Sequence, residues 1–118
     1  MIYDCIIIGG GVSGLMAALE LEKNNISYLL IEKNTSLGKK LLITGNNRCN
    51  VTNNKSIIDF VDDLTIENKR FLYSSLNGFG PEDIIAFLND NDVALVLEND
   101  LKYFPKSNKS ITILNTLK

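Results

Sequence analysis

Residues 3–32 read YDCIIIGGGVSGLMAALELEKNNISYLLIE, and this stretch decides the fold. The apolar run 3–8 ends in β-branched residues and stops at glycines, which predicts a strand buried on both faces. Apolar residues then recur at helical spacing from Leu15, and the helix should end near Asn24 and Asn25 because Asn tolerates a left-handed terminus. Residues 28–31 repeat the strand pattern. Strand, helix and strand in about thirty residues form a βαβ unit, so the two strands are expected to be parallel.

The turn after the first strand carries three glycines, Gly9, Gly11 and Gly14, at G-x-G-x-x-G spacing. Gly9 permits the tight turn, Gly11 lets the backbone approach a diphosphate, and Gly14 lets helix and strand pack closely. The first helical N–H groups, from Val12 and Ser13 onward, would then face the diphosphate at the positive end of the helix dipole. Glu32 follows Gly14 by 18 residues, close to the spacing of about 20 at which an acid binds a ribose hydroxyl. The pattern predicts a dinucleotide site, and the alternative is a glycine-rich turn without a ligand.

The composition excludes several classes of function. The 118 residues suit one domain, and 12 Lys and Arg against 14 Asp and Glu give a net charge of −2, which argues against a nucleic-acid partner. The sequence has no His, which removes His-based metal sites and Ser-His-Asp triads, and neither Cys lies in a metal-binding motif. Asp4 and the glycines interrupt the apolar N-terminal run, so neither a signal peptide nor a membrane span is expected. We expect a reduced, cytoplasmic protein with no metal site.

The rest of the chain has a weaker pattern. Residues 33–54 are rich in Gly, Asn and Thr, which indicates an irregular loop with one helical turn at 39–42. Further along we expect short helices at 57–64 and 70–76, a helix from Pro81, two ribbon strands at 93–97 and 101–104, and a last helix from Asn108 capped by Ser107. The aromatic residues assigned to the core are Phe71, Tyr73, Phe79 and Phe87. We divide the chain into residues 1–54, the dinucleotide-binding part with its loop, and residues 55–118, a helical and β-ribbon segment.

Two stretches after the second strand carry a family resemblance. Residues 32–40, EKNTSLGKK, resemble the E-K-x-x-x-x-G-G-K/R stretch of flavoproteins of the glutathione-reductase type, in which this loop passes along FAD. Residues 41–53, LLITGNNRCNVTN, are similar to the K-L-L-x-T/S-G-N-G-R-C-N-x-T-N signature of the BaiN-like, or aminoacetone-oxidase-family, NAD(P)/FAD-dependent oxidoreductases. Residues 98–110 resemble a further segment of that family. The resemblance covers this whole chain and about the first third of the family's length.

The resemblance implies FAD as the cofactor, a small organic substrate, and NAD(P)H as an electron donor. NADP is disfavoured in the first site, because Glu32 would repel its 2′-phosphate. The resemblance adds a set of candidate cofactor-binding residues from the loop: Lys33, Lys40, Thr44, Gly45, Asn46, Arg48, Cys49 and Asn50. Two charged members have an alternative: a solvated loop charge for Lys40 and a loop-bracing salt bridge for Arg48. Cys49 is assigned a structural role ahead of a redox role, and no catalytic residue is identified.

Three positions depart from the family pattern. Asn47 replaces a Gly, and Asn still adopts the left-handed backbone conformation. Lys102 replaces an Arg and lacks its bidentate fork. Ser110 replaces an Ala, a change that we expect to be minor.

The fold class expected is α/β, a Rossmann-like βαβ unit with an incomplete parallel sheet. Three functions remain open: the N-terminal FAD-binding part of an FAD-dependent oxidoreductase, a non-catalytic dinucleotide-binding remnant of a split or truncated gene, and an NAD-dependent dehydrogenase half-domain. In the first case the partner is the missing C-terminal part of the same enzyme, which would pair with the free edge of residues 5–8. The chain alone is then expected to have that edge unpaired and its apolar faces only partly covered. It is expected to be poorly soluble or partly unfolded, colourless and inactive.

Overall fold

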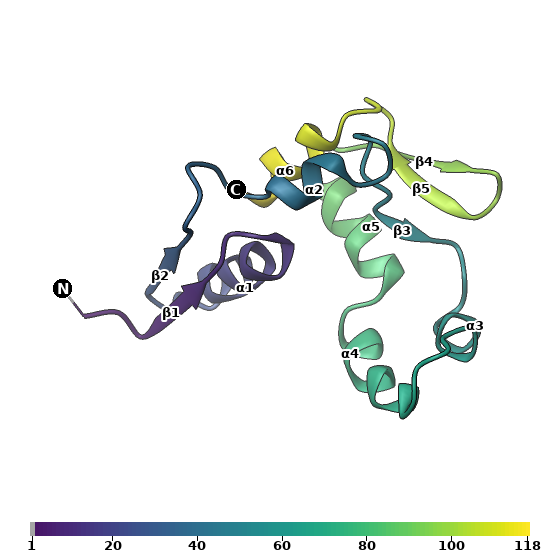
Figure 1. Cartoon of the computed structure of the whole chain (residues 1–118), viewed down its shortest axis with the longest axis horizontal. Helices are drawn as coiled ribbons and strands as arrows, with labels where there is room; N and C mark the ends of the chain where they lie inside the picture. Colours follow the sequence, from purple (N-terminus) through teal and green to yellow (C-terminus); the bar gives the residue numbers. More distant parts are fainter. Residues whose placement is uncertain (1) are drawn as a thin grey trace. The chain divides into compact units, whose positions relative to one another are not determined.

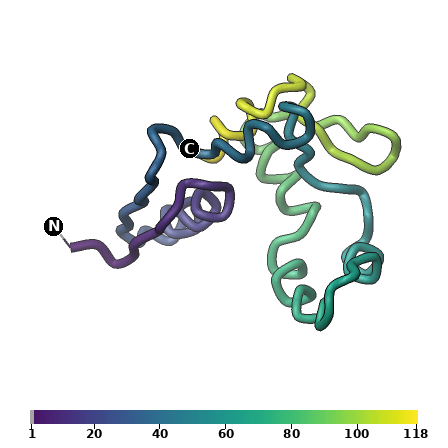
Figure 2. The backbone as a smooth tube through the Cα atoms, viewed as in Figure 1, coloured from purple at the N-terminus to yellow at the C-terminus, as the bar shows by residue number. Residues whose placement is uncertain are grey.

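The computed structural model describes residues 2–118, which divide into two compact units (Figures 1 and 2). The first unit comprises the chain up to Cys49 together with Lys109–Lys118, and the second comprises Asn50–Asn108. The sequence suggested a division after residue 54, whereas the contacts divide the chain after Cys49. The last ten residues return to the first unit, a long-range association that local sequence patterns do not contain.

The first unit opens with the βαβ unit. Strand β1 (Cys5–Ile8) leads through the glycine turn into helix α1 (Val12–Lys23), and strand β2 (Tyr28–Ile31) follows. The strands are parallel, and their register pairs Cys5 with Tyr28 and Ile8 with Ile31. Helix α1 has Asn24 as its C-cap, and Asn25 takes a φ of 55°. The predicted strands, helix end and parallel pairing are therefore confirmed.

The two faces of this small sheet differ in burial. Ile7 is buried against α1, which contributes the buried residues Leu15 and Ala18. Ile6 and Ile8 point to the opposite face and are 59% and 85% exposed. The apolar pattern of β1 is that of a strand buried on both faces, but among residues 2–118 no helix or strand covers its second face. This confirms the expectation that the apolar faces of β1 are only partly covered in this chain. Within the same residues β1 pairs with β2 alone, which confirms the expected unpaired edge.

Two helices complete the first unit. Helix α2 (Lys39–Ile43) contacts helix α6 (Ser110–Leu117), and they contribute the buried residues Leu41, Ile113, Leu114 and Leu117. Gly38 precedes α2 with a φ of +67°, and a Cβ there would lie 2.3 Å from a Leu114 methyl carbon. The predicted start of α6 is wrong: the helix begins at Ser110, and its N-cap is Lys109. Asn108 takes a φ of 55°, a left-handed conformation that a right-handed helix cannot include.

The second unit comprises three helices and a three-stranded antiparallel sheet, and the last of these helices lies beside the sheet (Figure 1). The helices are α3 (Ile57–Asp62), α4 (Leu72–Gly78), which follows the short 3-10 turn η1 (Lys69–Phe71), and α5 (Pro81–Asp90). The strands are β3 (Thr52–Asn53), β4 (Leu95–Glu98) and β5 (Lys102–Pro105), in the order β3-β5-β4. The predicted ribbon is confirmed as β4 and β5, and the turn between them has positive φ at Asn99 and Asp100.

Buried apolar side chains from different elements form the core of the second unit. The most buried are Val61 of α3, Leu88 of α5 and Pro105 of β5, and Phe104 of β5 is 6% exposed. Phe71 and Phe79 are 67% and 45% exposed, so their assignment to the core is wrong. Among residues 2–118, no helix is long and apolar enough to cross a membrane.

Candidate functional site: the glycine turn and the acid after β2

The three motif glycines meet different surroundings. Gly9 has a φ of +103°, and its N–H donates to the carbonyl oxygen of Ile31 at 2.8 Å. A Cβ on Gly14 would lie 2.0 Å from the carbonyl oxygen of Gly9, so only glycine lets α1 pack this closely on the turn. A Cβ on Gly11 would meet no atom within 4 Å. Gly11 is therefore not required by packing within the turn, and its backbone lies beside open space.

The N-terminus of α1 presents donors toward that space. The N-cap is Gly11, which offers no side-chain hydrogen bond, and the first turn holds no acidic residue. Val12 and Ser13 are both exposed. The first N–H groups of an α-helix have no partner inside the helix, and the dipole makes that end positive. This helix end therefore has the charge and the donors that a phosphate group requires.

Glu32 lies directly beside the glycine turn. One carboxylate oxygen, Oε2, accepts a hydrogen bond from the Gly10 N–H at 2.8 Å. The other, Oε1, accepts from the Asn34 N–H at 2.8 Å and from its side-chain Nδ2 at 2.6 Å. The hydrogen bonds from Asn34 and Gly10 lower the pKa of Glu32. An ionised acceptor is thus fixed at the end of β2, where the sequence predicts the ribose acid.

The loop after β2 is attached to the same turn. The N–H of Gly38 donates to the carbonyl oxygen of Gly10 at 2.8 Å, and Lys39 Nζ donates to Asn34 Oδ1 at 3.3 Å. A Cβ on Gly10 would lie 2.3 Å from a Leu37 methyl carbon. Gly10 occupies a variable position of the motif, so sequence reasoning missed its role. The one feature of the sequence that pointed to Gly10 was its place in a run of three consecutive glycines.

Both lysine candidates of this loop are exposed. The side chains of Lys33 and Lys40 lie at the surface of the first unit. The structure therefore agrees equally with contact to a bound anion and with solvated charge.

The signature loop, residues 44–49, is built from left-handed residues. Gly45, Asn46, Asn47 and Cys49 have φ values of 54°, 54°, 64° and 63°. The N–H of Arg48 donates to the Gly45 carbonyl at 3.2 Å, and that of Cys49 to the Thr44 carbonyl at 3.0 Å. The expectation that Asn47 takes a left-handed conformation in place of glycine is confirmed. Of the remaining candidates, Arg48 is half-buried in the first unit, and Asn50 is exposed at the start of the second.

Cys49 has the environment of a structural thiol. It is 6% exposed, and burial raises its pKa, an effect that the hydrogen bond with Thr44 partly opposes. A raised pKa reduces the fraction of nucleophilic thiolate at neutral pH.

Ser110 is a residue whose importance sequence reasoning missed. It is 4% exposed, its hydroxyl donates to the Leu42 carbonyl at 2.7 Å, and its N–H donates to the Asn47 carbonyl at 2.9 Å. These bonds attach the start of α6 to the signature loop. The only signal in the sequence was the departure from the family's Ala.

Comparison with known proteins identifies the family. The family described as HI0933-like protein Rossmann domain matches residues 3–118. The chain belongs to this family. We therefore interpret the glycine turn, Glu32 and the signature loop as parts of this Rossmann domain.

Among residues 2–118, no group of three or more Cys, Asp or Glu is arranged to hold a metal ion.

Characterised relatives are similar over different parts of the chain. The chain is 30% identical over 114 residues to a 3-dehydro-bile acid delta(4,6)-reductase of Clostridium scindens, covering 94% of this chain and 27% of that protein. It is 31% identical over 92 residues to the ribosomal RNA dihydrouridine synthase of Escherichia coli, covering 78% of this chain and 22% of that protein. Over 39 residues, 33% of the chain and 7% of the relative, it is 51% identical to the FAD-dependent monooxygenase asqG of Emericella nidulans. The chain spans about a quarter of the length of the first two.

Proposed function

We propose that the first unit binds the adenosine diphosphate portion of FAD as part of an FAD-dependent oxidoreductase. The observation that carries the proposal is the placement of the Glu32 carboxylate on the Gly10 N–H, 2.8 Å away. This bond sets an ionised acceptor next to the uncapped N-terminus of α1. A ribose hydroxyl and the adjoining diphosphate need such a pair, an acceptor and a positive donor end, side by side.

The residues then have separate tasks. The N–H groups at Gly11, Val12 and Ser13 would bind the diphosphate, and Gly9 and Gly14 would shape the turn that exposes them. Glu32 would accept from a ribose hydroxyl through lone pairs that Gly10 and Asn34 leave available, since a carboxylate has about four acceptor sites. Lys33 and Lys40 would add positive charge near the diphosphate. For the flavin end we propose residues of the signature loop and the residue that follows it: Thr44, Gly45, Asn46, Arg48, Cys49 and Asn50.

The choice of FAD over other dinucleotides has two supports. Glu32 disfavours a 2′-phosphate, which argues against NADP in this site. The relative asqG is named an FAD-dependent monooxygenase, and its 51% identity over 39 residues is higher than that of the longer matches. Bound FAD would supply hydride and electron transfer, while this chain's residues hold and orient it.

For the whole protein we propose reduction of a small organic substrate with electrons from NAD(P)H. The name of the Clostridium scindens relative denotes a reductase of a small molecule, and that of the Escherichia coli relative denotes an enzyme of ribosomal RNA. The net charge of −2 favours the small molecule, because RNA-binding surfaces carry an excess of Lys and Arg. The two free cysteines fit a reducing compartment, so we propose a cytoplasmic location.

The test is a titration of the ¹⁵N-labelled chain, at low micromolar concentration, with FAD, NAD⁺ and riboflavin. We expect FAD to shift the amide resonances of Gly11, Val12 and Ser13 and also those of residues 44–50. NAD⁺ should shift only the amide resonances of Gly11, Val12 and Ser13. Riboflavin, which lacks the diphosphate, should leave these three resonances unchanged.

The matched variant is Glu32→Ala, which should weaken FAD binding about tenfold through loss of a charged hydrogen-bond acceptor. Equal binding by the variant and the wild type would overturn the ribose assignment. Saturable shifts of the amide resonances with NAD⁺, and no shift with FAD, would favour a dehydrogenase half-domain instead.

A further inference from the structure

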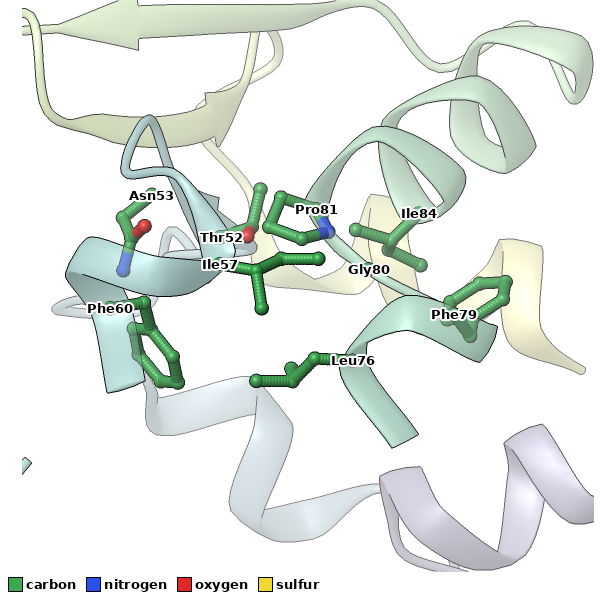
Figure 3. Close-up of a pocket in the computed structure, with 9 residues that line it drawn as sticks. All are labelled: Thr52, Asn53, Ile57, Phe60, Leu76, Phe79, Gly80, Pro81 and Ile84. Carbon is green, nitrogen blue, oxygen red and sulfur yellow. The ribbon is translucent and has the colours of Figure 1, made fainter. Parts of the chain in front are cut away.

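A pocket of about 210 Å³ lies in the second unit (Figure 3). Five apolar side chains form most of its wall: Ile57, Phe60, Leu76 and Ile84 of the three helices, and Phe79, the residue that follows α4. All except Phe79, which is exposed at the rim, are half-buried. In Figure 3, Ile57 and Leu76 point toward each other across the space, and Pro81 and Ile84 of α5 lie along another side. The pocket is therefore an apolar concavity that remains open in the folded chain.

The backbone beside the pocket is held in place. Gly80 is buried, and a Cβ there would lie 2.7 Å from the Leu76 carbonyl oxygen. The Gly80 N–H donates to Asp83 Oδ2 at 2.7 Å, and Pro81 opens α5. The start of α5 is therefore fixed, and Gly80 packs tightly against the backbone of α4. Because of this tight packing, the α5 side of the pocket has little freedom to move and fill the space.

Two polar side chains interrupt the apolar wall, Thr52 and Asn53 of β3. They end the signature that begins in the first unit, and the proposed flavin contacts do not include them. Antiparallel pairing with β5 fixes both residues, Thr52 opposite Tyr103 and Asn53 opposite Lys102. Asn53 Oδ1 accepts from the Lys55 N–H at 3.0 Å, which orients the amide and makes its Nδ2 the donor. Figure 3 shows that nitrogen on the side of Phe60.

We propose that this pocket binds a small apolar ring that bears a carbonyl group, with Asn53 Nδ2 as the donor to the carbonyl oxygen. Binding pockets are mostly apolar, with a few placed polar groups that fix orientation. A cavity of about 150 Å³ binds benzene, so about 210 Å³ accommodates one ring with a short substituent. The inference rests on the proposed function in one respect, since the ligand would be the organic substrate or a part of it.

The test uses a fluorescent reporter, because the sequence has no Trp. Phe79→Trp places the reporter at the pocket rim, and Phe71→Trp places a matched reporter on an exposed residue that does not line the pocket. Both variants of the full chain are titrated with cyclohex-2-enone and with cyclohexene, the hydrocarbon without the carbonyl. We expect a saturable change in emission with the ketone for Phe79→Trp, and only a linear, collisional change for Phe71→Trp.

A second variant tests the donor. Adding Asn53→Leu to Phe79→Trp should weaken cyclohexenone binding about fivefold, the loss of one hydrogen bond, and leave cyclohexene binding unchanged. Linear responses in both reporters would overturn the pocket, and equal affinity for the ketone and the hydrocarbon would overturn the carbonyl assignment. No FAD is present, so these outcomes are independent of the titration that tests the FAD site.

Discussion

The carboxylate of Glu32 and the backbone N–H of Gly10 are joined by a hydrogen bond of 2.8 Å that spans 22 residues of sequence. The bond ties the end of β2 to the turn that follows β1. One side chain therefore shapes the glycine turn and also faces the proposed ribose position. Substitutions at Glu32 should affect folding and ligand binding together, and the pH dependence of stability separates the two.

Stability should fall in acid through Glu32. Hydrogen bonds from Asn34 and Gly10 lower its pKa in the folded chain, so the ionised form contributes stability above the ordinary glutamate pKa. That contribution is lost as the pH falls through the lowered pKa. We expect the urea midpoint of the wild type to exceed that of Glu32→Gln at neutral pH and the two to converge as the pH falls below the lowered pKa of Glu32. Chemical denaturation across pH 3–7 checks this, and a constant difference over that range would contradict it.

Gly11 and Gly14 should respond to alanine in opposite ways. A Cβ at Gly14 would lie 2.0 Å from the Gly9 carbonyl oxygen, so Gly14→Ala should cost about 1–3 kcal/mol of stability, the scale of overpacking. A Cβ at Gly11 meets nothing within 4 Å, so Gly11→Ala should leave stability within about 1 kcal/mol. The same Cβ would occupy the space proposed for the diphosphate, so FAD binding should be lost.

Urea denaturation and FAD titration of both glycine variants provide the measurements. Retained FAD binding in a folded Gly11→Ala chain would show that the diphosphate lies elsewhere.

The βαβ unit was predictable because its signals are local. Residues 3–32 contain the two strand patterns, the turn glycines, the helix period and the acid, and each element forms from neighbours in sequence. Strand β3 was missed because two residues, Thr52 and Asn53, carry no period. It exists as a strand only through pairing with β5, about fifty residues later.

Long-range contacts also explain what was missed at the site. Ser110 bonds to Leu42 across 68 residues, and the Gly10 N–H donates to Glu32 across 22 residues. The exposure of Ile6 and Ile8 likewise depends on which other elements are present, so a run of apolar residues predicted burial that this chain does not provide.

Cys49 should react more slowly than Cys5 with iodoacetamide. Burial raises the pKa of Cys49 and blocks access, whereas Cys5 is half-buried. We expect Cys5 to be alkylated at least about tenfold faster at pH 8, since the thiolate is the reacting species. Mass spectrometry of the native chain gives both rates, and Cys5→Ser isolates the slow site. Faster modification of Cys49 than of Cys5 would revive the redox interpretation.

The uncovered face of β1 should drive self-association of the isolated chain. Ile6 and Ile8 are exposed on this face, with Leu29 and Ile31 opposite them in the register of β2. Contiguous exposed aliphatic residues beside an unpaired strand edge favour aggregation. Light scattering of the wild type should therefore rise steeply with protein concentration. The purified sample should be colourless, because this chain alone binds FAD too weakly to retain it through purification.

The variant that tests this cause is Ile6→Lys with Ile8→Lys, which places two like charges on the exposed face and should reduce scattering with no loss of helical circular dichroism. Ile58→Lys with Ile66→Lys is the matched control, since it adds the same two charges at residues of the second unit that are 63% and 51% exposed. An equal reduction of light scattering in the control would show that the added net charge, and not the exposed face of β1, is the cause. A wild-type chain that stays monomeric at high concentration and purifies yellow would show that the first unit is complete without further strands.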